Sequence, residues 1–227
     1  MMTMRGLFSL TTAMVPAAAL LLLALLVAGI ADPARAGVTD LTVIPLKSGL
    51  NYIDDFATDG RRGLIVVGWR DNGDAWGYHV YLVMLKLAAE TDAWEVVTAG
   101  TGQQPGGDGV PQVDIIRDTP HTVEDAIASV RFAHGRVDGQ PATLLIIARR
   151  EVLTAPSVGS ATPVAFDIFR LIPNGGDVGR PSHYFARIDT LRTAKRYCNA
   201  DLALNKELHL PLPQPYVGPN LEDGCPK

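Results

Sequence analysis

The sequence has few of the residues that mark several classes of protein. It has only two cysteines among 227 residues, and aromatic residues make up 7% of the chain. Two cysteines exclude a dense disulfide scaffold. The 20 basic residues do not outnumber the 24 acidic ones, so no broad basic surface for nucleic acid is expected.

The common catalytic motifs are also missing. No G-x-S-x-G, H-E-x-x-H or S-x-x-K pattern occurs, and the glycine-rich stretch 100–109 lacks the spacing of a phosphate-binding loop. No two of the five histidines have zinc-ligand spacing. The sequence therefore predicts neither a cofactor nor a metal ion.

The N-terminus carries the most specific signal. Arg5 precedes an apolar run at 17–31, and Ala34 and Ala36 provide the small residues that a signal peptidase reads. The run is shorter than the roughly 20 residues of a membrane-spanning helix. We expect residues 1–36 to be a cleaved signal peptide of bacterial type, with a retained anchor as the alternative. The rest of the chain is then periplasmic or secreted and has no stable membrane span.

Export changes the interpretation of the two cysteines. In an oxidising compartment Cys198 and Cys225 are expected to form a structural disulfide. Five prolines lie between 211 and 226, which favours an extended tail. Helical periodicity appears only within 184–208, with Thr190 or Asn199 as a possible N-cap.

Two β-hairpins are indicated in the middle of the chain. Strands at 63–70 and 75–87 flank Asn72-Gly73, a preferred pair for a two-residue turn. That turn places Trp69 opposite Trp76, with His79 and Tyr81 on the other side of the sheet. The second hairpin joins strands at 129–135 and 142–150 through Asp138-Gly139, which places Phe132 opposite Leu145. Further strands are expected at 41–46, 94–98, 113–116 and 164–172, with 94–98 pairing with 78–87.

These patterns predict a mainly β fold. We expect an antiparallel sandwich or a strongly curved sheet of about eight strands, with a short helical C-terminal segment and a disulfide-linked, proline-rich tail. Residues 37–197 would form the β-domain, and residues 198–227 the helix and tail.

The densest group of reactive side chains lies at 118–125. His121 with Asp118 or Asp125 could act as an oriented general base, with or without a divalent cation. The favoured interpretation is structural, because Thr122 could cap a helix or turn whose first residues are acidic.

Trp69, Trp76 and Tyr78 form the second candidate group. They would bind a sugar ring or an apolar partner if their side of the hairpin is open, and they would be core residues if it is covered. Their aliphatic neighbours favour the core.

Three functions are compatible with these observations. The favoured one is a non-enzymatic exported domain that binds an envelope protein or a small ligand through loops on a rigid sheet. The alternatives are a periplasmic hydrolase that uses His121 with Asp118 or Asp125, and a purely structural envelope protein.

Overall fold

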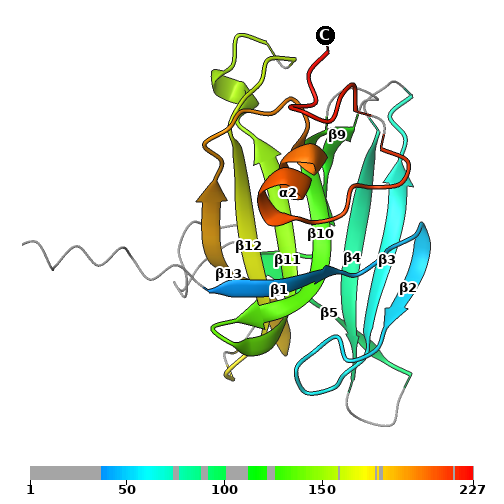
Figure 1. Cartoon of the computed structure of the whole chain (residues 1–227). Coiled ribbons are helices and arrows are strands. Elements are labelled where there is room, and N and C mark those ends of the chain that lie inside the picture. The colour runs from blue at the N-terminus through cyan, green and yellow to red at the C-terminus, as the bar shows by residue number, and fades with distance from the viewer. Residues whose placement is uncertain are drawn as a thin grey trace, which may run out of the picture. The chain divides into compact units, whose positions relative to one another are not determined.

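A computed structural model describes residues 37–226 apart from 74–76, 88–91, 101–111, 122–125, 158, 177, 179–180 and 217. The chain forms two β-sheets (Figure 1). The eight-stranded sheet, here sheet A, has the order β1-β10-β11-β12-β13-β6-β7, and β9 also pairs with β10. Its strands are β1 (Val38–Val43), β6 (Thr98–Gly100), β7 (Gln112–Val113), β9 (Thr119–His121), β10 (Ala126–Val137), β11 (Gln140–Arg150), β12 (Val164–Pro173) and β13 (His183–Arg192).

The five-stranded sheet, here sheet B, has the order β2-β3-β4-β5, and β8 pairs with β4 beside β5. Its strands are β2 (Gly49–Ile53), β3 (Gly63–Arg70), β4 (Tyr78–Lys86), β5 (Trp94–Val96) and β8 (Ile115–Arg117). Within the described ranges, the strand pairs are antiparallel except for the parallel pair β13–β6. The predicted mainly β, antiparallel sandwich is confirmed. The strands outnumber the eight expected, partly because 112–121 divides into three short ones.

Two apolar cores hold three layers together. Between the sheets, Val67, Tyr81 and Val83 of sheet B share one core with Phe132 and Leu145 of sheet A. The opposite face of sheet A packs on α2 (Ala200–Leu208) and the C-terminal tail, and Figure 1 shows this helix lying over β10 and β11. A short 3-10 helix, Val152–Thr154, follows β11. Sheet A is therefore covered on both faces.

The second hairpin has the predicted register. Phe132 pairs with Leu145, Val130 with Ile147 and His134 with Thr143. The turn residues Asp138 and Gly139 have φ of 51° and 76°, the left-handed values that a two-residue hairpin turn needs. The third predicted pairing is also confirmed, since Met84 pairs with Val96.

The predicted register of the first hairpin is wrong by three residues. Trp69 pairs with His79 and Val67 with Tyr81, so the connection runs from 71 to 77. Asp71 Oδ1 instead accepts a local hydrogen bond from the Gly73 amide, 2.9 Å away. A shift by an odd number reverses the faces of β4, because side chains alternate along a strand. The observed register buries Tyr81, Val83 and Leu85, which outweighs the preference of Asn-Gly for a tight turn.

The C-terminal segment matches its prediction only in part. Residues 183–192 form strand β13, which pairs along almost all of β12, so Thr190 is not a helix cap. The helix begins after Asn199, whose side-chain oxygen accepts hydrogen bonds from the amides of Asp201 and Leu202. Cys198 and Cys225 form the expected disulfide. The tail packs closely on the cap: a side chain at Gly224 would meet Asn199 at 2.7 Å.

The expected signal peptide, residues 1–36, lies outside the described residues. Within the described part of the chain, no helix is long and apolar enough to cross a membrane.

Substitution of Asn199 tests how much the N-cap stabilises α2 and the tail that packs on it. Asn199→Ala removes the acceptor for two amides, so we expect the free energy of unfolding to fall by about 1–2 kcal/mol. Urea unfolding measures the loss. Asn199→Ser keeps an acceptor and should recover most of the stability; equal losses in both variants would contradict this role.

Candidate functional site

The candidate site forms where one edge of β10 has no strand partner. β1 pairs with β10 up to Ala133, and β9 pairs with it from Ala128 back to Ala126. Among the described residues, no strand pairs with this edge of β10 between those two positions. The Ile44 amide donates to the Phe132 carbonyl at 2.8 Å, and the Arg131 guanidinium donates to the Val130 carbonyl at 2.9 Å. The Arg131 side chain thus donates to the Val130 carbonyl a hydrogen bond that a neighbouring strand would donate elsewhere in the sheet.

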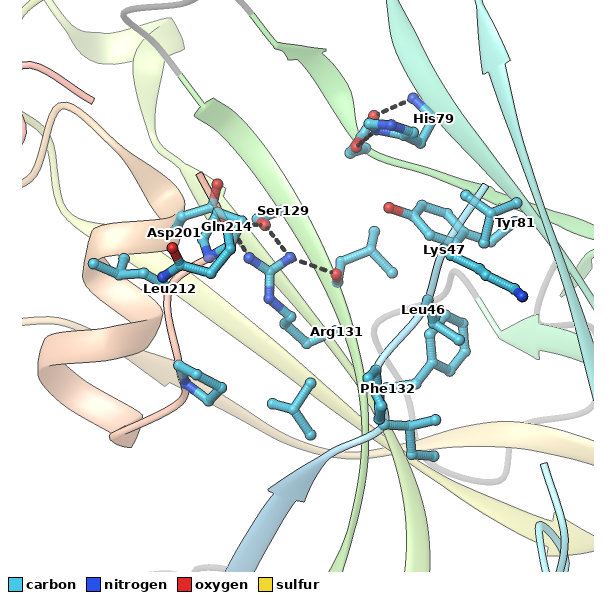
Figure 2. A pocket seen from close by; sticks show the side chains of 18 of the residues that line it. Leu46, Lys47, His79, Tyr81, Ser129, Arg131, Phe132, Asp201, Leu212 and Gln214 are labelled. Carbon is cyan, nitrogen blue, oxygen red and sulfur yellow. Dashed lines mark hydrogen bonds and ion pairs between the residues drawn. The ribbon is translucent and has the colours of Figure 1, made fainter. Parts of the chain in front are cut away.

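The chain crosses between the sheets on both sides of this gap. Residues 44–48 lead from β1 in sheet A to β2 in sheet B, and Asp118 connects β8 in sheet B to β9 in sheet A. Between the crossings lies a cavity of about 550 Å³, closed on its third side by α2 and the tail (Figure 2). Its apolar wall includes Leu46, Val67, Tyr81, Val130 and Phe132. We call it the edge cavity.

A buried ion pair lies in the edge cavity. Arg131 Nη2 is 2.5 Å from Asp201 Oδ1, and the exposed fractions of their side chains are 17% and 3%. Ser129 donates to the same carboxylate oxygen and accepts from Arg131 Nη1 at 3.0 Å. Figure 2 shows the guanidinium between β10 and the helix. The pair fixes the first turn of α2 against sheet A and presents charge beside the apolar part of the wall.

A second polar group lies on the sheet B side of the cavity. Asp118 is 5% exposed, and its two carboxylate oxygens accept from the His79 amide at 2.7 Å and from His79 Nδ1 at 3.0 Å. Burial, and then the nearby Asp118 carboxylate, raise the pKa of the Tyr81 phenol above its ordinary value. Tyr81 therefore enters the cavity as a neutral hydrogen-bonding group.

The structure brings one residue from each predicted group close to His79. Asp118 binds His79, and the Trp69 ring lies edge-on to the His79 imidazole with centroids 4.8 Å apart. Trp69 is 51% exposed, so the prediction that it is a core residue is wrong. The side chain is exposed because it extends past the end of the interior, over Gly77, where an added Cβ would meet it at 2.0 Å.

The remaining predicted residues do not join this group. Tyr78 lies on the opposite face of sheet B, where Arg70 and Arg117 stack on its ring at 5.3 and 5.7 Å. It therefore does not form one platform with Trp69. Asp125 and Trp76 lie outside the described residues, and the side chain of His121 is not described either. Among the described residues, no group of three His, Cys, Asp or Glu is placed to hold a metal ion.

Sequence reasoning missed three important residues. His79 was assigned to the wrong face by the register error. Arg131 and Asp201 are 70 positions apart, so no local motif connects them. The sequence did offer one indication of Arg131: it is a charged residue in a predicted strand whose neighbouring residues are apolar on both faces.

A second cavity of about 320 Å³ lies at another edge of the sandwich, between β8 and β11–β13. Asp167 on its wall accepts from Arg149, from Arg187 at 3.4 Å and from Thr190 at 2.9 Å. These donors hold the carboxylate within the sheet. The cavity is smaller than the edge cavity and contains none of the predicted site residues.

A separate polar cluster joins the two sheets away from both cavities. Arg61 donates to Asp59 and Glu95 at 2.8 and 3.0 Å, and its Nη2 lies 2.5 Å from Nδ1 of the buried His183. Burial, and then the Arg61 charge, hold the pKa of His183 below its ordinary value. Burial of Asp59 works in the opposite direction, yet hydrogen bonds from Arg61 lower the pKa of its carboxyl. The cluster connects the two sheets, and the His183 imidazole within it is neutral.

Fold and site define a two-sheet β-sandwich with a ligand-sized cavity at one edge. The crystal structure of CarG has a similar fold, with a TM-score of 0.56 and 18% sequence identity over 75% of this chain and 99% of CarG. At this identity the likeness extends to the fold alone. The chain matches no known family model and no curated protein.

The buried ion pair predicts strong coupling between its partners. Arg131→Met leaves Asp201 charged and buried, so the free energy of unfolding should fall by about 3 kcal/mol. Arg131→Met combined with Asp201→Leu removes both charges and should cost less than Arg131→Met alone. Denaturant unfolding of the two single variants and the double variant gives the coupling energy, and additive losses would show that the charges do not interact.

The neutral state of His183 predicts a loss of stability in mild acid. The unfolded chain binds a proton near pH 6.5, whereas the folded protein resists protonation to lower pH. The free energy of unfolding should therefore be highest above pH 6.5 and fall below it, until the folded-state pKa is reached. His183→Asn should flatten this dependence in urea unfolding measured at several pH values. An unchanged pH profile in the variant would assign the dependence to other groups.

Proposed function

We propose that this protein is an exported binding protein of the cell envelope that holds a small ligand in the edge cavity. The observation that carries the proposal is a cavity of about 550 Å³ that combines an apolar wall with a few converging polar groups. Small-molecule sites usually have this volume and composition. The polar groups come from both sheets and from α2, so they are held by rigid elements.

The lining indicates the chemistry of the ligand. Tyr81, Phe132 and Val67 favour a flat or compact apolar body. Arg131 and Asp201 offer a donor and an acceptor within one ion pair, and His79 and Asp118 offer a second polar position. A neutral or zwitterionic ring compound fits this wall, because Arg131 already faces Asp201 and His79 already faces Asp118. The exposed Lys47, which also lines the cavity, adds one positive charge.

Sequence features support the exported location. The N-terminal segment has the charge, the apolar run and the small residues of a signal peptide. The Cys198–Cys225 disulfide is typical of proteins that fold in an oxidising compartment.

The hydrolase hypothesis remains an alternative prediction. Asp118, one of the two carboxylates proposed to orient His121, has both oxygens occupied by His79. His121 lies in β9, but its side chain is not among those described, nor is Asp125. No described contact favours catalysis over binding.

Native mass spectrometry of the protein purified from its own cells tests the proposal. We expect a chain that begins at Gly37 and carries a retained small mass, or else binding of ring-containing fragments. In the second case, NMR titration should shift the signals of the Arg131 guanidinium and the Tyr81 ring. A bare chain whose cavity signals do not move with any fragment would overturn the binding proposal.

A pair of matched variants separates the edge cavity from other surfaces. Leu212→Trp places an indole at the wall of the cavity and should abolish retention or weaken fragment binding by at least about tenfold. Leu221→Trp makes the same change at a residue of the tail that is 59% exposed and does not line the cavity, and should leave binding unchanged. Equal effects of the two variants would place the ligand elsewhere.

A further inference from the structure

The outer face of sheet B is apolar across its full width. Two rows of paired residues cross four strands on this face. The rows are Leu50-Val66-Leu82-Ile115 and Tyr52-Leu64-Met84-Val96. Trp94 pairs with Lys86 next to the second row, and its ring lies 5.9 Å from that of Tyr52.

Much of this face is open to solvent. Leu50, Tyr52 and Ile115 are each more than half exposed, at 52%, 52% and 56%, and Val96 is 37% exposed. Sheet A has α2 and the tail over its outer face, whereas no described helix packs on the outer face of sheet B. A contiguous apolar patch of this kind is uncommon on a monomer and usually marks an interface.

Charge is distributed unequally along the strands of this face. At one end, Arg70 and Arg117 stack on Tyr78. At the other end, Asp54 and Asp92 project into solvent with side-chain exposures of 81% and 107%. Arg62 and Lys86 lie at the same end in exposed, weak pairs with these carboxylates, and Arg62 also stacks on the Tyr52 ring at 5.1 Å. The formal charge of this end is therefore balanced, whereas the other end carries two arginines. We call these the arginine end and the aspartate end.

We propose that this face binds a second copy of the same chain in a two-fold symmetric dimer. An axis across the strands lays the arginine end of each copy over the aspartate end of its partner, with the two apolar rows between them. Four strands of up to nine residues span roughly 20 Å by 30 Å, or about 600 Å² before side-chain relief. This is close to the area that each partner contributes to a specific interface of standard size.

Sedimentation equilibrium of the purified protein tests the dimer. We expect the mass of two chains at roughly 10 μM. Ile115→Glu buries a charge at the end of the first apolar row of the interface and should weaken dimerisation by about tenfold or more. The change lies on the surface of the monomer, so circular dichroism should show the same folded sandwich. A wild-type monomer throughout the micromolar range would overturn the proposal.

Matched variants distinguish this interface from other contacts. Leu153→Glu changes a fully exposed leucine far from sheet B and should leave the dimer intact. Reversing Arg70 and Arg117 to glutamate should weaken the dimer, and adding Asp54→Lys with Asp92→Lys should restore it. Failure of the second pair to restore it would refute the arrangement of the two ends. A wild-type monomer that instead sediments with anionic phospholipid vesicles would assign the face to a membrane surface.

Discussion

The alternation of side chains along β4 is the constraint on which the rest of the structure depends. Tyr81, Val83 and Leu85 are buried against sheet A, so every second residue of the strand must point the other way. The same alternation that completes the inner core aims His79 at the edge cavity. It also leaves Val80, Leu82 and Met84 on the outer face. The burial of one face of β4 therefore determines both the candidate binding site and the candidate interface.

The edge cavity exists because the sandwich is held open at a place where its strands do not pair. The two crossings at 44–48 and Asp118 keep the sheets connected, while α2 closes the remaining side through the Arg131–Asp201 pair. An ion pair at this depth adds little net stability over apolar packing, although breaking it is costly. Its position therefore indicates a role in specificity: it fixes how α2 and the tail lie and keeps charge available inside the cavity.

The contrast between the two hairpins shows what the sequence could predict. In the second hairpin, the preferred turn sequence and the apolar pattern agree, so the register follows from either one. In the first hairpin, residues of both parities in β4 are apolar, and the pattern cannot decide which set is buried. The Asn-Gly pair then decided the register, but only contacts with sheet A select the correct one. The prediction that Trp69 is a core residue failed for a different reason: Trp69 is on the same face of β3 as the buried Val67, but it extends past the end of the interior.

The candidate site was less predictable than the fold because its residues are far apart in the sequence. Asp118 was identified among local neighbours, yet its partner His79 lies 39 positions away in another strand. A carboxylate that looks free in the sequence of a loop can thus be hydrogen-bonded to the amide and the ring of a residue far away in the sequence. The position of such a group depends on sheet order, which local patterns do not encode.

The edge cavity and the outer face of sheet B are physically separable although they share a strand. Residues of one parity in β4 line the cavity and residues of the other parity form the outer face, so a substitution on one side leaves the other side's groups in place. A change at one site could reach the other only by displacing the backbone of β4. The antiparallel pairing of β4 with β3, β5 and β8 resists such a displacement. A ligand in the cavity would therefore bind the monomer and the dimer with similar affinity, unless it moves β4 as a whole.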